Sequence, residues 1–146
     1  MATTISNATL TVQTIESVTL NGKDYGGTNS STFANINEVD RRIVPIPTSE
    51  IGIVSFGAAA GAGTFVRANL KYLRISNKDD TNFISLKLTD GSAEHAWFKI
   101  PAGGEFVLNE AVLEAASTFS AFENLTAISA IADTAAVDIE YFIALT

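Results

Sequence analysis

The sequence predicts an all-β fold, an antiparallel two-sheet sandwich of about eight or nine strands, and a jelly roll is one topology compatible with that number. Nine Phe, three Tyr and one Trp accompany many Val, Ile and Thr residues, and such side chains pack well on a pleated sheet. Turn residues also recur at near-regular intervals between the apolar runs. With 146 residues, 47% of them hydrophobic, the chain fits one domain with a sizeable core.

Residues 1–8 are small and polar, so we expect a flexible N-terminal arm, followed by a single β-sandwich domain over residues 9–146. The start of the chain has neither a basic segment nor an apolar one, and a signal peptide is therefore not expected. No apolar stretch approaches the roughly 20 residues that a membrane-spanning helix needs.

The alternation of residues 9–20 is that of a strand, with Leu10 and Val12 on one face. Asn21-Gly22 follows, and this pair predicts a type I′ hairpin turn because both residues tolerate a positive φ. Residues 23–25 then form a short return strand, and residues 26–32 are expected to be a polar loop.

The segment around residues 42–47 is expected to be an edge strand or a corner, because Pro45 and Pro47 cannot donate to a sheet ladder. Residues 51–56 have the alternation of a clear strand. The following run, GAAAGAG at residues 57–63, suits neither a helix nor a strand and predicts a surface loop.

The centre of the chain is the most regular part and predicts an antiparallel meander or sandwich of four strands joined by short turns. The strands are expected at residues 70–75, 83–88, 95–100 and 105–108, with turns at 77–82, 90–91 and 101–104. Residues 109–122 approach helical spacing, so either one short helix near residues 110–120 or an irregular excursion is expected there. Two further strands, at 126–131 and 137–145, complete the chain.

Charge and composition exclude several classes of function. Nine basic residues against sixteen acidic ones give a net charge of −7, and only Arg41 and Arg42 are adjacent. Such a chain repels phosphate backbones and anionic lipid surfaces, so we expect neither nucleic acid nor a membrane as partner. The absence of cysteine excludes disulfides, thiolate catalysis and zinc–thiolate sites.

The remaining chemistry-bearing residues do not assemble an active site, and we expect no enzyme, no cofactor and no metal. His95 is the sole histidine, whereas a metal-dependent hydrolase on a jelly roll would need several, and a surface histidine beside a turn is the plainer interpretation. Asn77, Asp79, Asp80 and Asn82 could offer oxygens to a cation. The same residue types favour a tight turn held by its own backbone bonds.

Three segments together resemble small virion structural proteins of tailed bacteriophages, cyanophages among them. They are LKYLRISNKDDTNFISL from Leu70, WFKIPAGGEFVL from Trp97 and ADTAAVDIEY from Ala132. The similarity spans about residues 50–146 and consists of strand-and-turn signatures. It implies a β-sandwich that attaches to an icosahedral head or to a tail.

That resemblance leads to the first hypothesis, a capsid decoration or cement protein on the head exterior of a virion. It would bind the outer surface of the major capsid protein, stabilise the head and self-associate as a homotrimer. Contact residues are expected in the N-terminal arm and the glycine-rich loop: Ala2, Thr3, Thr4, Ile5, Gly57, Gly61 and Gly63. The alternative is a tail, neck or fibre component or a host-surface glycan-binding module, in which Trp97 or Tyr141 would stack on a sugar.

Overall fold

The computed structural model describes residues 4–91, 94–109 and 125–146, and these residues are nearly all β. Their only helical element is the 3₁₀ turn η1 (Arg67–Asn69). The strands, in chain order, are β1 (Ala8–Glu16), β2 (Thr19–Leu20), β3 (Lys23–Asp24), β4 (Gly27–Ile36), β5 (Glu38–Ile46), β6 (Ile51–Gly57), β7 (Thr64–Val66), β8 (Leu70–Asn77), β9 (Ile84–Asp90), β10 (His95–Ile100), β11 (Glu105–Leu108), β12 (Leu125–Ala132) and β13 (Val137–Leu145). The predicted all-β class is confirmed.

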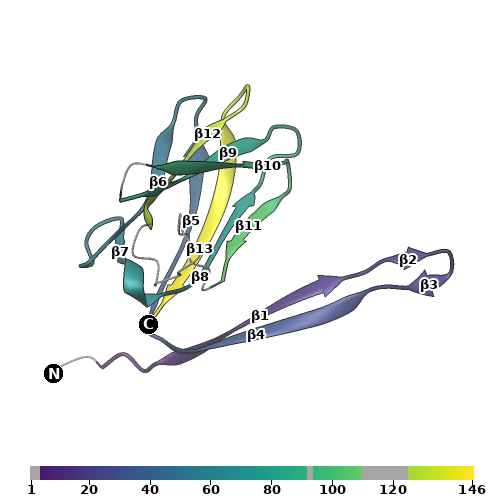
Figure 1. The fold of residues 1–146 in the computed structure, drawn as a ribbon, viewed down its shortest axis with the longest axis horizontal. Coiled ribbons are helices and arrows are strands. Elements are labelled where there is room, and N and C mark those ends of the chain that lie inside the picture. Colours follow the sequence, from purple (N-terminus) through teal and green to yellow (C-terminus); the bar gives the residue numbers. More distant parts are fainter. Residues whose placement is uncertain (1–3, 92–93, 110–124) are drawn as a thin grey trace.

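Nine strands form two facing sheets, with the order β10-β9-β12-β6-β7 in one and β11-β8-β13-β5 in the other (Figure 1). Six pairs of consecutive strands lie in opposite sheets: β5 and β6, β7 and β8, β8 and β9, β10 and β11, β11 and β12, and β12 and β13. Four of these pairs lie antiparallel to one another, β5–β6 against β13–β12 and β8–β9 against β11–β10. This is the strand order of a jelly roll, with β7 added in parallel beside β6.

Of the two arrangements expected for the centre of the chain, an antiparallel meander or a sandwich, the structure shows the sandwich. Among these four strands only β9 and β10 form a hairpin, whereas β8 pairs with β11 and β13 and β9 pairs with β10 and β12. A turn of a few residues can join neighbours within a sheet or strands in two facing sheets. Here the apolar side chains of β8 and β9 face each other, so the turn between them bridges the layers.

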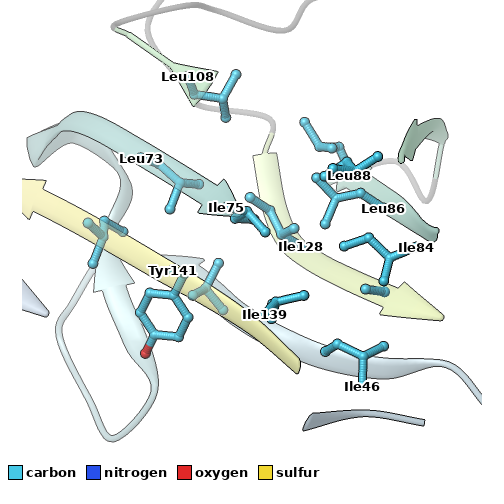
Figure 2. Close-up of a cluster of buried hydrophobic side chains, with 14 of the residues drawn as sticks. Ile46, Leu73, Ile75, Ile84, Leu86, Leu88, Leu108, Ile128, Ile139 and Tyr141 are labelled. Carbon is cyan, nitrogen blue, oxygen red and sulfur yellow. The ribbon is translucent and has the colours of Figure 1, made fainter. Parts of the chain in front are cut away.

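The core lies between the two sheets and is built by the alternation of each strand. Along β9, Ile84, Leu86 and Leu88 are buried while the side chains between them are partly exposed. Figure 2 shows these side chains with those of β8, β12 and β13 that meet them. The fully buried members with the largest side chains are Tyr141, Ile46, Leu73, Ile75, Ile84, Leu86, Leu125, Ile128, Ile139, Ile143, Leu145 and Val137.

Residues 8–36 form a hairpin that lies outside both sheets, which we call the hairpin arm. Its strands β1 and β4 pair along their length, and β2 and β3 pair at the tip (Figure 1). Asn21 and Gly22 have φ values of 50° and 78°, which confirms the predicted type I′ turn. The loop expected at residues 26–32 is wrong, because this segment pairs with β1 and belongs to β4.

The base of the hairpin arm packs on the outer face of the four-stranded sheet, the face turned away from the core. Leu10, Val12, Phe33 and Ile36 of the arm meet Tyr72, Phe142 and Ala144 of β8 and β13. The Phe33 and Phe142 rings each lie 6.0 Å from the Tyr72 ring, in tilted arrangements. This second cluster buries Tyr72 on the outer face of β8, while Leu73 and Ile75 of the same strand are buried in the core between the sheets.

Other local expectations are confirmed. The proline-containing strand β5 is the last strand of its sheet, so Pro45 lies on an edge strand as predicted. Residues 51–56 form most of β6, and residues 58–63 make an exposed loop between β6 and β7. Of the segment in which a helix or an irregular excursion was expected, residues 110–122 lie outside the described residues.

A buried and an exposed isoleucine provide a matched test of this core. Ile139→Ala empties space at a fully buried position, and we expect the free energy of unfolding to fall by about 2–5 kcal/mol. Ile5→Ala makes the same chemical change at a 70% exposed side chain, and should alter it by less than about 0.5 kcal/mol. Urea unfolding followed by circular dichroism measures both. Equal effects of the two substitutions would contradict the sandwich packing.

Candidate interaction surface

Exposed apolar side chains are concentrated on one part of the molecule. In the described residues, ten large hydrophobic side chains are exposed, and eight of them belong to the N-terminal segment, the hairpin arm or the outer face of the four-stranded sheet. They are Ile5, Ile15, Val18, Leu20, Tyr25, Val39, Ile43 and Val107. Clustered exposed apolar groups mark interaction surfaces, because burying them in an interface lowers the free energy.

The tip of the hairpin arm carries four of them: Ile15, Val18, Leu20 and Tyr25, each at least half exposed. The Asn21-Gly22 turn fixes the tip, and the Tyr25 amide donates to the Val18 carbonyl at 3.0 Å. Gly26 admits no side chain, since a Cβ there would lie 2.6 Å from the Glu16 carbonyl oxygen. The sequence therefore builds an ordered tip that displays apolar groups.

The edges of the arm carry little of the usual protection against pairing with another strand, and the one register irregularity of the β1–β4 pair lies at the base of the arm, between Ala8 and Leu10. A two-stranded hairpin leaves the outer hydrogen-bonding groups of both strands unpaired within its own sheet. Strands β1 and β4 contain no proline and a single charged residue, Glu16. Natural edge strands are commonly blunted by charge, proline or a bulge. An edge so poorly protected is suited to contact with another chain.

Between the arm and the sheet lies a groove of about 520 Å³, bounded by arm residues such as Leu10 and Gln13 and by Arg74, Glu105 and Val107 of the sheet. Beside it, charged side chains of the outer face form a linked network. Glu140 accepts from Arg41 at 3.1 Å and from Arg74 at 2.6 Å. Arg74 also reaches Glu105 at 3.3 Å, and Ser76 donates to Glu105 at 3.0 Å.

The arginines hold the pKa of Glu140 below its usual value, with the Arg41 hydrogen bond as the largest cause. The carboxylate is therefore ionised at neutral pH and fully committed to the network. Such a network orders the outer face of the four-stranded sheet. Its arrangement is that of a structured surface.

The structure places the predicted contact residues in two separate regions. Thr4 and Ile5 are exposed and precede β1, while Ala2 and Thr3 lie outside the described residues. Gly57 ends β6, and Gly61 and Gly63 lie in the exposed loop that leads to β7, where Gly61 and Thr64 exchange backbone hydrogen bonds at 3.1 Å. Their accessibility suits contact, and their role stays a prediction.

The candidate metal and catalytic residues occupy ordinary structural positions. Asn77 accepts the Asp79 amide, and Asp79 accepts the amides of Thr81 and Asn82 at 2.8 and 2.6 Å. The turn is thus held by its own side chains, and these bonds lower the pKa of Asp79. His95 starts β10 with its ring 6.1 Å from that of Trp97. Among the described residues, no three His, Asp or Glu side chains gather as a metal ion would require.

The two aromatic residues expected to stack on a sugar have different positions. Trp97 is 47% exposed on the outer face of the five-stranded sheet, with the Lys87 ammonium 5.4 Å from its ring centroid. Lys87 is paired with Glu50 at 3.1 Å, and Glu50 accepts from Ser129. Tyr141 is buried in the core, so the expectation that it stacks on a ligand is wrong. Its position on the inner face of β13 places it there.

The sequence matches no protein-family model and no curated protein. No helix in the described part of the chain is long and apolar enough to span a bilayer.

The hairpin arm is the feature that sequence reasoning missed. Its pattern contained a signal, because residues 27–32 are Gly, Thr, Asn and Ser and offer no apolar face to a core. A strand with two polar faces cannot be an inner strand of a sandwich. Pairing it with residues 8–16 through the Asn21-Gly22 turn would have predicted a hairpin lying outside the sheets.

Tyr141 generates a test of the core by pH. Burial, followed by its 2.6 Å hydrogen bond to Asp40, raises its pKa to about 12. The pKa of Tyr141 is therefore higher in the folded state than its value of about 10 in the unfolded chain, so folding is favoured fully below pH 10. This contribution to the free energy of unfolding is lost as the pH rises through about 12. We expect a loss on the order of 2–3 kcal/mol over that range.

Urea unfolding at a series of pH values from 8 to about 12 measures this loss. Tyr141→Phe should be less stable at pH 8 and should lose less stability as the pH rises. Tyr72→Phe is the control. Burial also raises the pKa of Tyr72, so this substitution should remove a different part of the loss of stability with rising pH. An unchanged alkaline slope in Tyr141→Phe would refute the assignment.

Proposed function

We propose that this protein is a structural subunit of a tailed-bacteriophage virion, a capsid decoration protein that binds the outer surface of the major capsid protein and stabilises the head. The observation that carries the proposal is the hairpin arm, which extends from a compact jelly roll with apolar side chains displayed at its tip. A chain that displays such groups on an ordered arm is suited to work inside an assembly.

Two further observations support a binding role over a catalytic one. Arg41, Arg74, Glu105 and Glu140 on the outer face of the four-stranded sheet are joined in ion pairs, and His95 has no second histidine with which to share a metal. The jelly roll itself is compatible with many functions, so the fold alone does not choose among them. The resemblance of residues 50–146 to phage virion proteins is the reason for proposing a virion as the assembly.

The proposed contacts with the capsid are the N-terminal segment with Ile5, and Gly57 at the end of β6 together with the loop after it, which contains Gly61 and Gly63. Residues 4–7 and 58–63 are exposed and uncharged, so they can approach an acidic or a basic surface without a large desolvation cost. Many copies on one head make modest contacts effective, since each head presents the same site repeatedly.

Binding to heads that lack this protein tests the proposal. We expect the purified protein to co-sediment with such heads and to raise the temperature at which they release DNA. Ile5→Ser should weaken binding by about 10- to 100-fold, as expected for the loss of one buried apolar side chain. Trp97→Ala is the control, because Trp97 is an exposed apolar side chain on the outer face of the five-stranded sheet, away from the proposed contacts. Absence of binding to heads and of the polypeptide from purified virions would refute the proposal.

A second candidate is a tail, neck or fibre component or a host-surface glycan-binding module, and Trp97 favours it. An exposed indole beside hydrogen-bonding groups such as Lys87, Glu50 and Ser129 can stack on the apolar face of a sugar ring.

Glycan arrays and copy number separate this candidate from the first. A glycan-binding module should bind particular glycans and lose them in Trp97→Ala but not in Ile43→Ala, which lies on the opposite sheet. It should also be present as a few copies per virion, whereas a decoration protein should be present as hundreds. Many copies together with empty arrays would eliminate the second candidate.

A further inference from the structure

We propose that the tip of the hairpin arm docks on the outer face of the four-stranded sheet of a second copy of this chain, against Val39 and Ile43. This inference deepens the self-association expected of a decoration protein and rests on that proposed function. It names the two surfaces that meet, the arm tip (Ile15, Val18, Leu20 and Tyr25) and the β5 strip (Val39, Arg41 and Ile43).

The arm tip needs a partner. Its four apolar side chains are 50–71% exposed, and they lie beyond the part of the arm that packs on its own sheet. Figure 1 shows the tip, with β2 and β3, at the end of the arm far from the sandwich. A free two-stranded hairpin is marginally stable in water. Contact with another chain would stabilise the tip by burying these groups.

The β5 strip has the chemistry that this arm already binds. Within one chain the arm base places Leu10, Val12 and Phe33 on the outer face of β8 and β13. Val39 and Ile43 continue the same face onto β5, since they pair with Ala144 and Glu140 of β13. They are 55% and 67% exposed, so the chain's own arm leaves them uncovered. The acceptor surface is therefore continuous with an interface that the fold itself forms.

The charge distribution favours this pairing of copies. The chain carries −7, but residues 8–36 contribute only Glu16, Lys23 and Asp24, a net −1, which leaves −6 for the rest. The arm is thus the segment that approaches another copy with the least repulsion. On the β5 strip the Arg41 side chain is 62% exposed, and it can attract the carboxylates near the tip.

The contact joins two different surfaces, so it is heterologous and closes into a ring when successive rotations add up to a full turn. A trimer is the ring that suits a local threefold position on an icosahedral head. Each copy would then give one arm and receive one arm.

Cysteine cross-linking tests the contact, since the chain contains no cysteine. Leu20→Cys and Ile43→Cys are prepared as separate full-length proteins of different tag length, mixed and oxidised, and run on a non-reducing gel. We expect a heterodimer band from this mixture. Ala59→Cys mixed with Ile43→Cys is the matched control, because Ala59 is also exposed but lies in the loop after β6. It should give at least tenfold less heterodimer.

The mass in solution provides the second measurement. By light scattering the unmodified protein should have about three times its 15.4 kDa chain mass. Leu20→Ser and Ile43→Ser should each shift it to the single-chain mass. Because both side chains are exposed, the far-ultraviolet circular dichroism should not change, which shows that the variants remain folded.

The outcomes separate this inference from the proposed function. A single-chain mass at high protein concentration, with no cross-link above the control, overturns the inference, and capsid binding can still hold. If Leu20→Ser abolishes head binding while the unmodified protein has a single-chain mass, the arm binds the capsid protein and the inference is wrong. Cross-linked rings that never bind heads would uphold the inference and refute the proposed function.

Discussion

The packing of the arm base on Tyr72, Phe142 and Ala144 is the interaction on which the functional surface depends. It covers part of the outer face of two strands, at Tyr72 of β8 and at Phe142 and Ala144 of β13, which would otherwise be solvated. It also anchors one end of a hairpin that could not remain ordered alone. Without this cluster, no packing contact would fix the direction of the arm and its tip relative to the sandwich. With it, the direction of the arm is set by the same strands that carry the core.

The jelly-roll crossings explain why that face is available. Each of β5, β8, β11 and β13 is joined along the chain to a strand of the opposite sheet, and each of them turns its inner side chains toward the core. The outer side chains are then free to vary along the sheet, from the aromatic cluster under the arm, through the Arg41, Glu140, Arg74 and Glu105 network, to the apolar β5 strip. Bonds within the Asn77–Asn82 turn hold one of these crossings in place.

Much of this fold could be predicted from local sequence, and the failures have physical reasons. The strands at residues 95–100, 105–108 and 137–145 coincide with β10, β11 and β13, because each alternates strictly or is bounded by Gly and Pro turns. Pairing was less predictable. The run after Asn77 has the chemistry of a tight turn, and turn chemistry does not say whether the next strand joins the same sheet or the facing one.

The interaction surface could be predicted least, since it depends on where a polar hairpin lies relative to a face that is distant in sequence. In the sequence, Leu10 and Phe33 have the pattern of ordinary strand residues. Their contact with Tyr72 and Phe142 follows only from the tertiary structure. Exposure of Leu20 and Ile43 likewise depends on the tertiary structure, since in the sequence each has the pattern of a half-buried strand residue. Small and polar neighbours favour Thr4, Ile5 and Gly61 as contact residues, a criterion that finds accessible loops and overlooks ordered strands.

An exposed apolar tip on bare strand edges is also a hazard, and the charge of the body limits it. Edge-to-edge pairing between arms would bring two bodies of net −6 toward each other, and that repulsion acts over about 10 Å at moderate salt. Docking of one tip on a β5 strip instead places a nearly neutral arm beside Arg41. The acidic body thus disfavours indiscriminate stacking of arms while leaving a specific contact accessible. A surface that is apolar at one point and negatively charged elsewhere favours ordered assembly over aggregation.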